Sequence, residues 1–374
     1  MSQFSGLGMT DVASRPRGGR VWWLGLGTFM VILMYVGLRN YLFVQDGMLN
    51  PNFELIHKAY DFNFGELPLI LIGVGVFFFG LALTWRGYRK WLLIFAGLYW
   101  FFGLDVLALR YYVTQYEPSQ LVVHRVTIKT PKLTTPLRLL HISDIQSGAI
   151  SEHERKIFDE IKALEPDIII NTGDFLQVVP PATFESELPK LMALIREVNP
   201  RYGTYAAFGD TELEMYRVPP DELKPMEFLA SQSQQVLTDA GVLSLHGLNL
   251  NDSRRLKWTL RSVSPWLETS EVSDFRILFG HAPDFALEVA DLPIDLCLAG
   301  HTHGGQVRLP GYGPLVIDSQ IPKEWARGFR QIGVPYLNVS AGAGSNRRGG
   351  LPPLRFNCPT EMTVIDLVPL RTIR

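Results

Sequence analysis

Two histidines, His301 and His303, stand two residues apart directly after the apolar run of residues 294–299. A short apolar run that ends in glycine is typical of a buried strand that gives way to a turn, and Gly300 provides that ending. Two side chains at the end of one strand can point to the same place, and imidazole is a common metal ligand. The pair therefore predicts one side of a metal site.

Four further strand-like runs also end on side chains that can bind a metal. These side chains are Asp144, Asp174, Asp210 and His281. In an open α/β sheet, ligand sites form outside the carboxyl ends of the strands, so these chain positions can converge. A lone histidine near a strand end is usually a satisfied polar group, and the prediction therefore rests on the whole set.

The first third of the chain is rich in tryptophan, phenylalanine, leucine and glycine, whereas most charged residues come later. Residues 21–38, 67–85 and 91–109 are each close to the roughly 20 residues that a helix needs to cross a bilayer. Asp105 is their only charged residue and lies near one end. Buried core helices hardly explain three such segments in a row. We expect a membrane region, residues 1–115, and a soluble domain, residues 116–374.

Basic residues flank these segments unevenly. Arg15, Arg17 and Arg20 precede the first segment, and residues 86–90 carry three more basic residues between the second and third. The positive-inside rule makes both flanks cytoplasmic, which places the soluble domain outside the cytoplasm. No small-residue cleavage site follows the first segment, so we expect an uncleaved, multi-pass protein of the cell (inner) membrane.

The charge of the chain is nearly balanced, with 35 lysines and arginines against 37 aspartates and glutamates. This balance argues against nucleic-acid binding as the main activity. Of the two cysteines, Cys297 and Cys358, the first lies inside an apolar run and is expected to be a buried thiol rather than half of a disulfide, so the cysteines do not decide the compartment. The sequence leaves the oligomeric state open.

From about residue 117, strand and helix signals alternate, which predicts a layered α/β domain. Ser151 and Glu154 form a capping box at the start of one expected helix. The other expected helices are residues 184–198 and 224–240. The expected strands include residues 121–128, 137–143 and 204–208.

The strand-end fragments, in their order along the chain, resemble the calcineurin-like metallophosphoesterases over roughly residues 120–370. The fragments are Asp144-Ile145-Gln146, Gly173-Asp174, Gly209-Asp210, Gly280-His281 and Gly300-His301-Thr302-His303. They are similar in particular to membrane-associated bacterial members related to UDP-2,3-diacylglucosamine pyrophosphatase. The resemblance implies a four-layer α-β-β-α sandwich, here preceded by three transmembrane helices, and a hydrolase of phosphate or diphosphate esters.

The resemblance also implies a centre of two divalent metal ions. Such a centre clamps a phosphoryl group and holds a hydroxide for in-line attack, and histidine and carboxylate ligands suit manganese, zinc or iron. Asp174 would bridge the two ions. The other implied ligands are Asp144, Gln146 and His303 for one ion, and Asp210, His281 and His301 for the other.

Three positions depart from the usual family pattern. Gln146 stands where most relatives have histidine, although its amide oxygen can still bind a metal. Asp210 stands in place of asparagine and adds a negative charge, which should tighten metal binding. Thr211 stands where the family has a histidine that contacts the phosphoryl group or protonates the leaving group. Threonine cannot supply that proton, so no catalytic residue is assigned, and diphosphates or activated phosphodiesters are the expected substrates.

Two functions remain open at this stage. The first is a membrane-anchored, metal-dependent hydrolase of phosphate or diphosphate esters near the bilayer, where a lipid-linked substrate is expected. The second is a catalytically weak metal-binding scaffold that recognises an anionic lipid or a protein partner, which the threonine at position 211 motivates.

Overall fold

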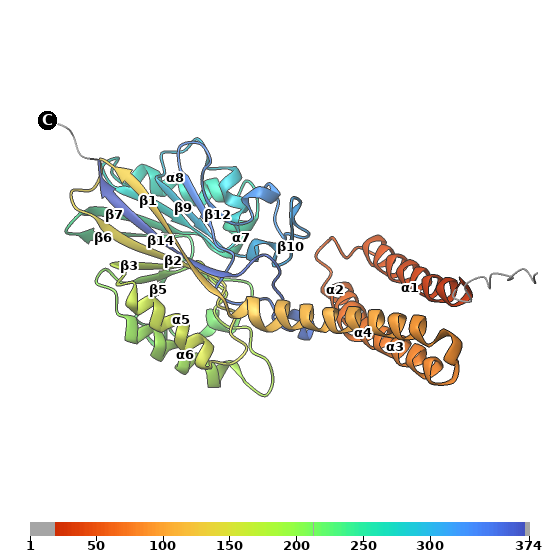
Figure 1. The fold of residues 1–374 in the computed structure, drawn as a ribbon. Helices are drawn as coiled ribbons and strands as arrows, with labels where there is room; N and C mark the ends of the chain where they lie inside the picture. Colours follow the sequence, from red (N-terminus) through yellow and green to blue (C-terminus); the bar gives the residue numbers. More distant parts are fainter. Residues whose placement is uncertain (1–18, 212, 371–374) are drawn as a thin grey trace, which may run out of the picture. The chain divides into compact units, whose positions relative to one another are not determined.

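The computed structural model describes residues 19–211 and 213–370. The chain divides into a helical unit, within Met1–Met48 and Glu54–Arg110, and an α/β unit, within Leu49–Phe53 and Tyr111–Arg374 (Figure 1). The division that we expect at residue 115 stays a prediction. Arg15 and Arg17, which enter the predicted orientation, lie outside the described residues.

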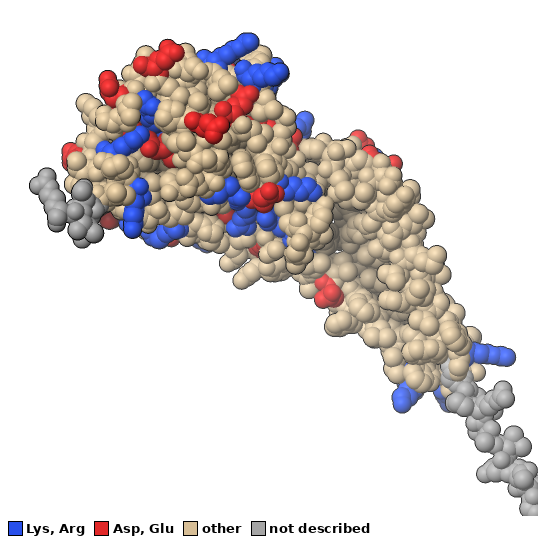
Figure 2. All heavy atoms as spheres, turned by 90° about the horizontal axis from the view of Figure 1, so that it is seen from above, with Lys and Arg blue, Asp and Glu red and all other residues tan. Residues whose placement is uncertain are grey.

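Three stretches of the described residues are long and apolar enough to cross a membrane, and all but residue 53 and residues 111–119 lie in the helical unit. They are Gly19–Gln45, Phe53–Thr84 and Arg86–Ser119, and they contain the three predicted spans apart from the last residue of the second. The helices within them are α1 (Gly19–Gln45), α2 (Phe53–Tyr60), α3 (Leu67–Thr84) and α4 (Arg89–Tyr111). Large apolar side chains cover the outside of this unit, and Figure 2 shows almost no charge along it. Such a surface suits lipid better than water.

Two half-buried amides join the first two stretches of the helical unit. The Asn40 amide donates to Asn63 Oδ1 at 3.0 Å, and Asn63 donates back to Asn40 Oδ1 at 2.8 Å. Each amide also donates to a main-chain carbonyl of its own helix. Paired polar side chains of this kind hold helices together where the hydrophobic effect between helices is weak.

The α/β unit is built on two six-stranded sheets. The first has the order β1 (Leu121–Thr130), β14 (Thr360–Pro369), β2 (Leu137–Ile142), β3 (Ile168–Asn171), β4 (Thr204–Ala206) and β5 (Met226–Phe228). The second has the order β12 (Gly328–Gln331), β13 (Tyr336–Val339), β9 (Leu296–Ala299), β8 (Phe275–Phe279), β7 (Gly241–Gly247) and β6 (Gln232–Thr238). A short hairpin, β10 (Arg308–Leu309) and β11 (Gly313–Pro314), stands apart from both.

The two sheets pack face to face, as the alternation of side chains along the strands requires. Leu139 and Ile170 point into the core between the sheets, where they meet residues such as Leu298. The neighbouring Leu140 and Ile169 point the other way, toward helices α5 (Glu152–Ala163) and α6 (Phe184–Val198). Helix α8 (Thr259–Thr269) covers the outer face of the second sheet through Val263 and Trp266, next to the short α7 (Leu250–Arg254) (Figure 1). The predicted α-β-β-α sandwich is confirmed.

The expected helix over residues 224–240 is wrong. This segment forms β5 and β6, with Ser231 between them in a left-handed conformation at φ 57°. β5 pairs with β4, and β6 pairs along its whole length with β7. Pairing with neighbouring strands outweighs the local preference of this segment for a helix.

His141, on β2, joins the two sheets through its ring. Its Nδ1 accepts a hydrogen bond from the Asn338 amide of β13 at 2.7 Å, and its Nε2 lies 3.1 Å from the Thr172 hydroxyl. The ring is fully buried, and this burial lowers the pKa of His141 to about 3 despite the opposing charge of Glu361. The folded chain therefore holds this histidine neutral.

Acidification should destabilise the α/β unit through His141. The unfolded chain protonates this ring below its ordinary pKa of 6.5, whereas the folded chain does not, so stability is complete above pH 6.5 and falls toward pH 3. The loss is about 1.4 kcal/mol per pH unit. Between pH 7 and pH 5, His141→Asn should lose about 2 kcal/mol less unfolding free energy than the parent chain. Urea unfolding of both chelator-treated proteins in detergent measures this, and equal losses would contradict the assignment.

Candidate metal centre

The candidate metal centre lies in the loops that follow five strands of the two sheets. Asp144, Asp174 and Asp210 follow β2, β3 and β4 of the first sheet, and His281 and His301 follow β8 and β9 of the second. Gln146 and His303 stand two residues beyond a predicted ligand in the same loops. The structure therefore brings all seven sequence-predicted residues to one edge of the sandwich.

Five of these seven residues have left-handed backbone conformations, which side chains other than glycine rarely adopt. Their φ values are 50° for Asp144, 39° for Gln146, 59° for Asp174, 69° for His301 and 49° for His303. Each such conformation carries a local cost, and residues of this kind cluster at functional sites, where the surrounding fold imposes them. The loops are thus shaped to aim these side chains inward.

Two glycines let the loops approach closely enough. A Cβ atom on Gly300 would lie 1.9 Å from Ser143 Oγ and 2.3 Å from Asp144 Oδ2. A Cβ atom on Gly209 would lie 1.9 Å from Asp174 Oδ1. Any larger residue at either position would push a carboxylate out of the centre.

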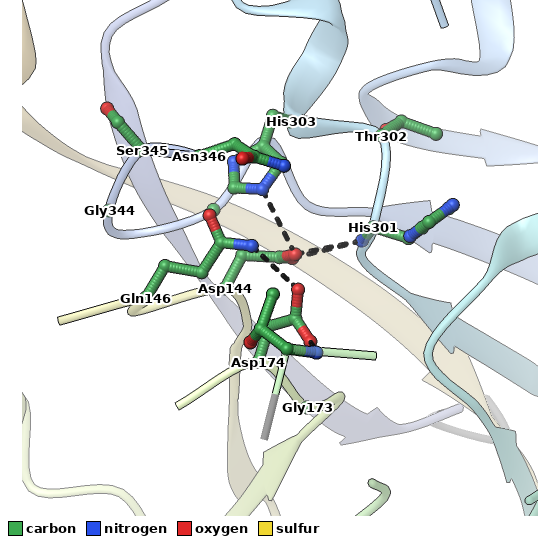
Figure 3. Close-up of polar contacts among 12 residues, drawn as sticks. Asp144, Gln146, Gly173, Asp174, His301, Thr302, His303, Gly344, Ser345 and Asn346 are labelled. Carbon is green, nitrogen blue, oxygen red and sulfur yellow. Dashed lines mark hydrogen bonds and ion pairs between the residues drawn. The ribbon is translucent and has the colours of Figure 1, made fainter. Parts of the chain in front are cut away.

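The side chains form two groups that share one histidine. The ligand atoms of Asp144, Asp174 and His281 lie within 4.8 Å of one another, and those of Asp210, His281 and His301 do the same. The main-chain N–H of His301 donates to both oxygens of Asp144, at 3.2 and 3.0 Å (Figure 3). The N–H groups of Asp210 and Thr211 donate to Asp174 Oδ1, at 2.7 and 3.1 Å. The carboxylates are therefore held in fixed orientations.

Main-chain carbonyls orient two of the histidines. His281 Nδ1 donates to the carbonyl of Thr172 at 2.8 Å, and His301 Nε2 donates to the carbonyl of Asp318 at 2.9 Å. A carbonyl can only accept, so His281 Nε2 and His301 Nδ1 are the nitrogens left to bind a metal, and they lie 3.2 Å apart. Outer hydrogen bonds of this kind fix metal-binding histidines in many proteins.

Gln146 and His303 each present a buried polar atom that has no hydrogen-bond partner among the described residues. Gln146 Nε2 donates to Asp174 Oδ2 at 2.7 Å, but its Oε1 has no partner. His303 Nε2 also has none and lies 3.4 Å from Asp144 Oδ1 (Figure 3). Leaving a buried polar atom unsatisfied costs about 1–3 kcal/mol, so native proteins rarely do so without a reason. An ion on this side would satisfy the amide oxygen and the imidazole nitrogen, so the residues fit a metal.

The electrostatics also fit a cation. Burial lowers the pKa of His281, but Asp174, Asp144 and Asp210 outweigh it and raise the pKa to about 9. Burial raises the pKa of Asp144 to about 7. Burial together with the Arg355 charge lowers the pKa of His303 well below its ordinary value, so this ring stays neutral, as a metal ligand must be. The carboxylates now favour a protonated, positively charged His281, and a divalent ion would supply that positive charge in its place.

Arg254 and Asp318 adjoin the centre and are not among the sequence predictions. Arg254, the last residue of α7, places Nη2 at 2.7 Å from Asp318 Oδ2 and Nη1 at 3.4 Å from Asp210 Oδ2. The sequence points to Arg254 only weakly. The one local signal is Asn249, which caps the short helix α7 after β7 by accepting the Asp252 N–H on its Oδ1. Asp318 follows the short apolar run of residues 315–317, as the predicted ligands follow theirs, but this run forms no strand.

The chain is similar in sequence to known metallophosphoesterases. The profile of the calcineurin-like phosphoesterase family matches residues 137–305, a range that contains all seven predicted ligands. The chain is 28% identical over 274 residues to the uncharacterized metallophosphoesterase YkuE of Bacillus subtilis, which covers 68% of this chain and 88% of that protein. It is 27% identical over 265 residues to an uncharacterized metallophosphoesterase of Aquifex aeolicus, covering 67% of this chain and 93% of that one. It is 26% identical over 269 residues to the phosphodiesterase YaeI of Escherichia coli, with coverages of 69% and 92%.

Gln146→Leu should weaken metal binding because it removes the unpartnered amide oxygen but keeps the size of the side chain. We expect the affinity for Mn²⁺ to fall at least about tenfold, which is the loss of affinity that is typical when a partner of a metal ligand is replaced. Gln146→Glu, which keeps an oxygen there, should retain the ion. Metal content after dialysis and titration calorimetry measure both.

Gln177→Leu is the matched control. Gln177 accepts the Arg347 N–H at 2.6 Å in a neighbouring loop and belongs to neither group of candidate ligands. Its replacement should leave the metal content unchanged. Equal affinities for the parent chain and the Gln146→Leu variant would remove Gln146 from the set of ligands.

Proposed function

Since the chain belongs to the calcineurin-like metallophosphoesterase family, we propose that it is a membrane-anchored hydrolase that cleaves phosphate or diphosphate esters with two divalent metal ions. The seven residues at the strand ends are the proposed ligands, with Asp174 between the ions. The observation that carries the metal centre of this proposal is the pair of buried, unpartnered atoms, Gln146 Oε1 and His303 Nε2, beside the two His–Asp groups.

The ions, when bound, would neutralise the phosphoryl oxygens and lower the pKa of a bound water. The protein contributes the fixed arrangement around them. Asp174 accepts hydrogen bonds from Asp210 and Thr211 on Oδ1 and from Gln146 on Oδ2, which holds its carboxylate in one orientation for a bridging role. The carbonyls of Thr172 and Asp318 keep the two histidine rings turned toward the same point.

Asp210 marks the side from which substrate reaches the centre. Its side chain is 31% exposed, whereas Asp174 is 2% and His301 6% exposed. A phosphoryl group would therefore approach over Asp210. Thr211, next in the chain, offers no titratable proton at ordinary pH, so leaving groups that are already weak bases fit this site best.

We place the substrate near the bilayer because three candidate spans precede the catalytic unit in the chain. Anchoring of this kind keeps an enzyme close to lipid head groups, and it supports a lipid-linked phosphate or diphosphate as the substrate. The preceding basic residues favour an extracytoplasmic location for the α/β unit.

Asp174→Asn should abolish phosphodiesterase activity in the detergent-solubilised full-length protein. We expect the rate of bis(p-nitrophenyl) phosphate hydrolysis with Mn²⁺ to fall by about 10³-fold or more. Without the bridging carboxylate the two metal ions would be misplaced, and several kcal/mol of transition-state stabilisation would be lost. Asp159→Asn, on an exposed part of α5, is the control and should keep full activity. A parent chain that binds two ions but hydrolyses neither this diester nor a diphosphate would favour the scaffold function instead.

Fusion of alkaline phosphatase after Arg374 should give an active reporter, and fusion of green fluorescent protein there should give none. The same reporters placed after Lys90, in the basic link between two spans, should behave in the opposite way. These outcomes follow from the positive-inside rule. Fluorescence at Arg374 without phosphatase activity would move the α/β unit to the cytoplasm and admit nucleotide-linked lipids as substrates.

A further inference from the structure

Arg254 is a cation at the more exposed side of the candidate metal centre. Its side chain is 39% exposed, and its guanidinium lies beside Asp210, the most exposed of the seven proposed ligands. A guanidinium has five N–H donors in a flat fork, and two of its nitrogens contact the carboxylates of Asp210 and Asp318. Donors therefore remain for a further anion that arrives over Asp210.

The fold holds Arg254 in place from both directions along the chain. Helix α7 is capped by Asn249, and its end is tied by the Thr259 hydroxyl, which donates to the carbonyl of Asp252 at 2.7 Å. Ser253 is fully buried against the loop of His281, where a Cβ atom on Gly280 would lie 2.8 Å from Ser253 Cβ. Asp318 links the arginine to the centre a second time, because its carbonyl orients His301 and its carboxylate binds Arg254. A side chain placed this firmly is suited to recognise a ligand.

We propose that Arg254 contacts the phosphoryl group of the substrate and stabilises the negative charge that its oxygens carry in the transition state. The inference rests on the proposed phosphoesterase function. Arginine suits this task because its fork matches phosphate oxygens, and a positioned guanidinium is a strong catalyst of phosphoryl transfer.

The same arginine narrows the substrate class, because a guanidinium stays protonated and cannot act as a proton donor. In the hydrolysis, the water oxygen forms a new P–O bond while the P–O bond to the leaving group breaks. The leaving oxygen keeps the electron pair, and the proton of the water passes to solvent. With charge stabilised at Arg254 and no acid at Thr211, the leaving group departs as an anion. Diphosphates and phosphodiesters with weakly basic leaving groups are therefore the preferred substrates.

The test compares Arg254→Gln with Arg255→Gln in the full-length, Mn²⁺-loaded protein in detergent. Arg255 is the matched control because it is the next residue and is exposed, with its guanidinium 5.3 Å from the centre of the Trp258 ring. For bis(p-nitrophenyl) phosphate, we expect kcat of the Arg254→Gln variant to fall about 10²–10³-fold, the usual effect of removing one transition-state donor. Arg255→Gln should stay within about twofold of the parent chain.

A second readout does not depend on turnover. Titration calorimetry with inorganic phosphate should show at least about tenfold weaker binding to the Arg254→Gln variant, since hydrogen bonds to charged groups are worth that much. The metal content should equal that of the parent chain. Unchanged kcat and unchanged phosphate binding would overturn the proposal, and so would a loss of activity that merely follows a loss of metal.

The double variant Asp210→Asn with Arg254→Gln separates contact with substrate from simple neutralisation of Asp210. If Arg254 only balances that carboxylate, removing the charge should restore the activity and phosphate binding of the Arg254→Gln chain, and this would overturn the proposal. Contact with substrate predicts no such recovery. A parent chain without turnover on any diester or diphosphate would instead remove the proposed function itself, and the role of Arg254 in catalysis with it.

Discussion

The charge of carboxylates buried at one edge of the sandwich is the constraint on which the centre depends. Asp144 and Asp174 are almost wholly inaccessible to water, and desolvation makes ionised carboxylates costly unless a cation or several donors face them. Main-chain N–H groups face Asp144 and Asp174. The negative charge of these carboxylates and of Asp210 outweighs burial and raises the pKa of His281 to about 9. Left-handed backbone at these positions and glycines in the facing loops make the close approach possible.

Packing of the two sheets is what brings these charges together. Three carboxylates come from loops of one sheet, while the histidines come from the other, so the centre forms only when the sheets are aligned. The interdigitated core aligns them broadly, and His141, bound to Asn338 of the second sheet, adds a directional contact close to the site. Hydrophobic burial supplies most of the driving force in such a sandwich, whereas the buried polar contact favours one register.

Much of this arrangement follows from local sequence because strand ends are marked by local signals. An apolar run that ends on a polar side chain locates Asp144, Asp174 and His281 without knowledge of the fold, and a glycine precedes the last two. Arg254 lacks such a mark, and the apolar run before Asp318 forms no strand. The approach of these two residues to Asp210 and His301 depends on how distant loops fold over the edge. Residues 224–240 fail as a helix for a similar reason, because their strand pairing is decided by β4 and β7.

The arginine at position 254 changes the significance of the threonine at position 211. Loss of a proton donor alone would make a two-metal centre a poor enzyme for most esters and would favour a binding role. A fixed guanidinium on the same side stabilises charge instead of supplying a proton, and this serves substrates whose leaving group needs no proton. The unpartnered atoms Gln146 Oε1 and His303 Nε2 would bind an ion in a scaffold as well as in an enzyme, so they do not distinguish the two functions. The residues that distinguish the two functions are therefore those on the more exposed side of the centre, where Arg254 contacts Asp210.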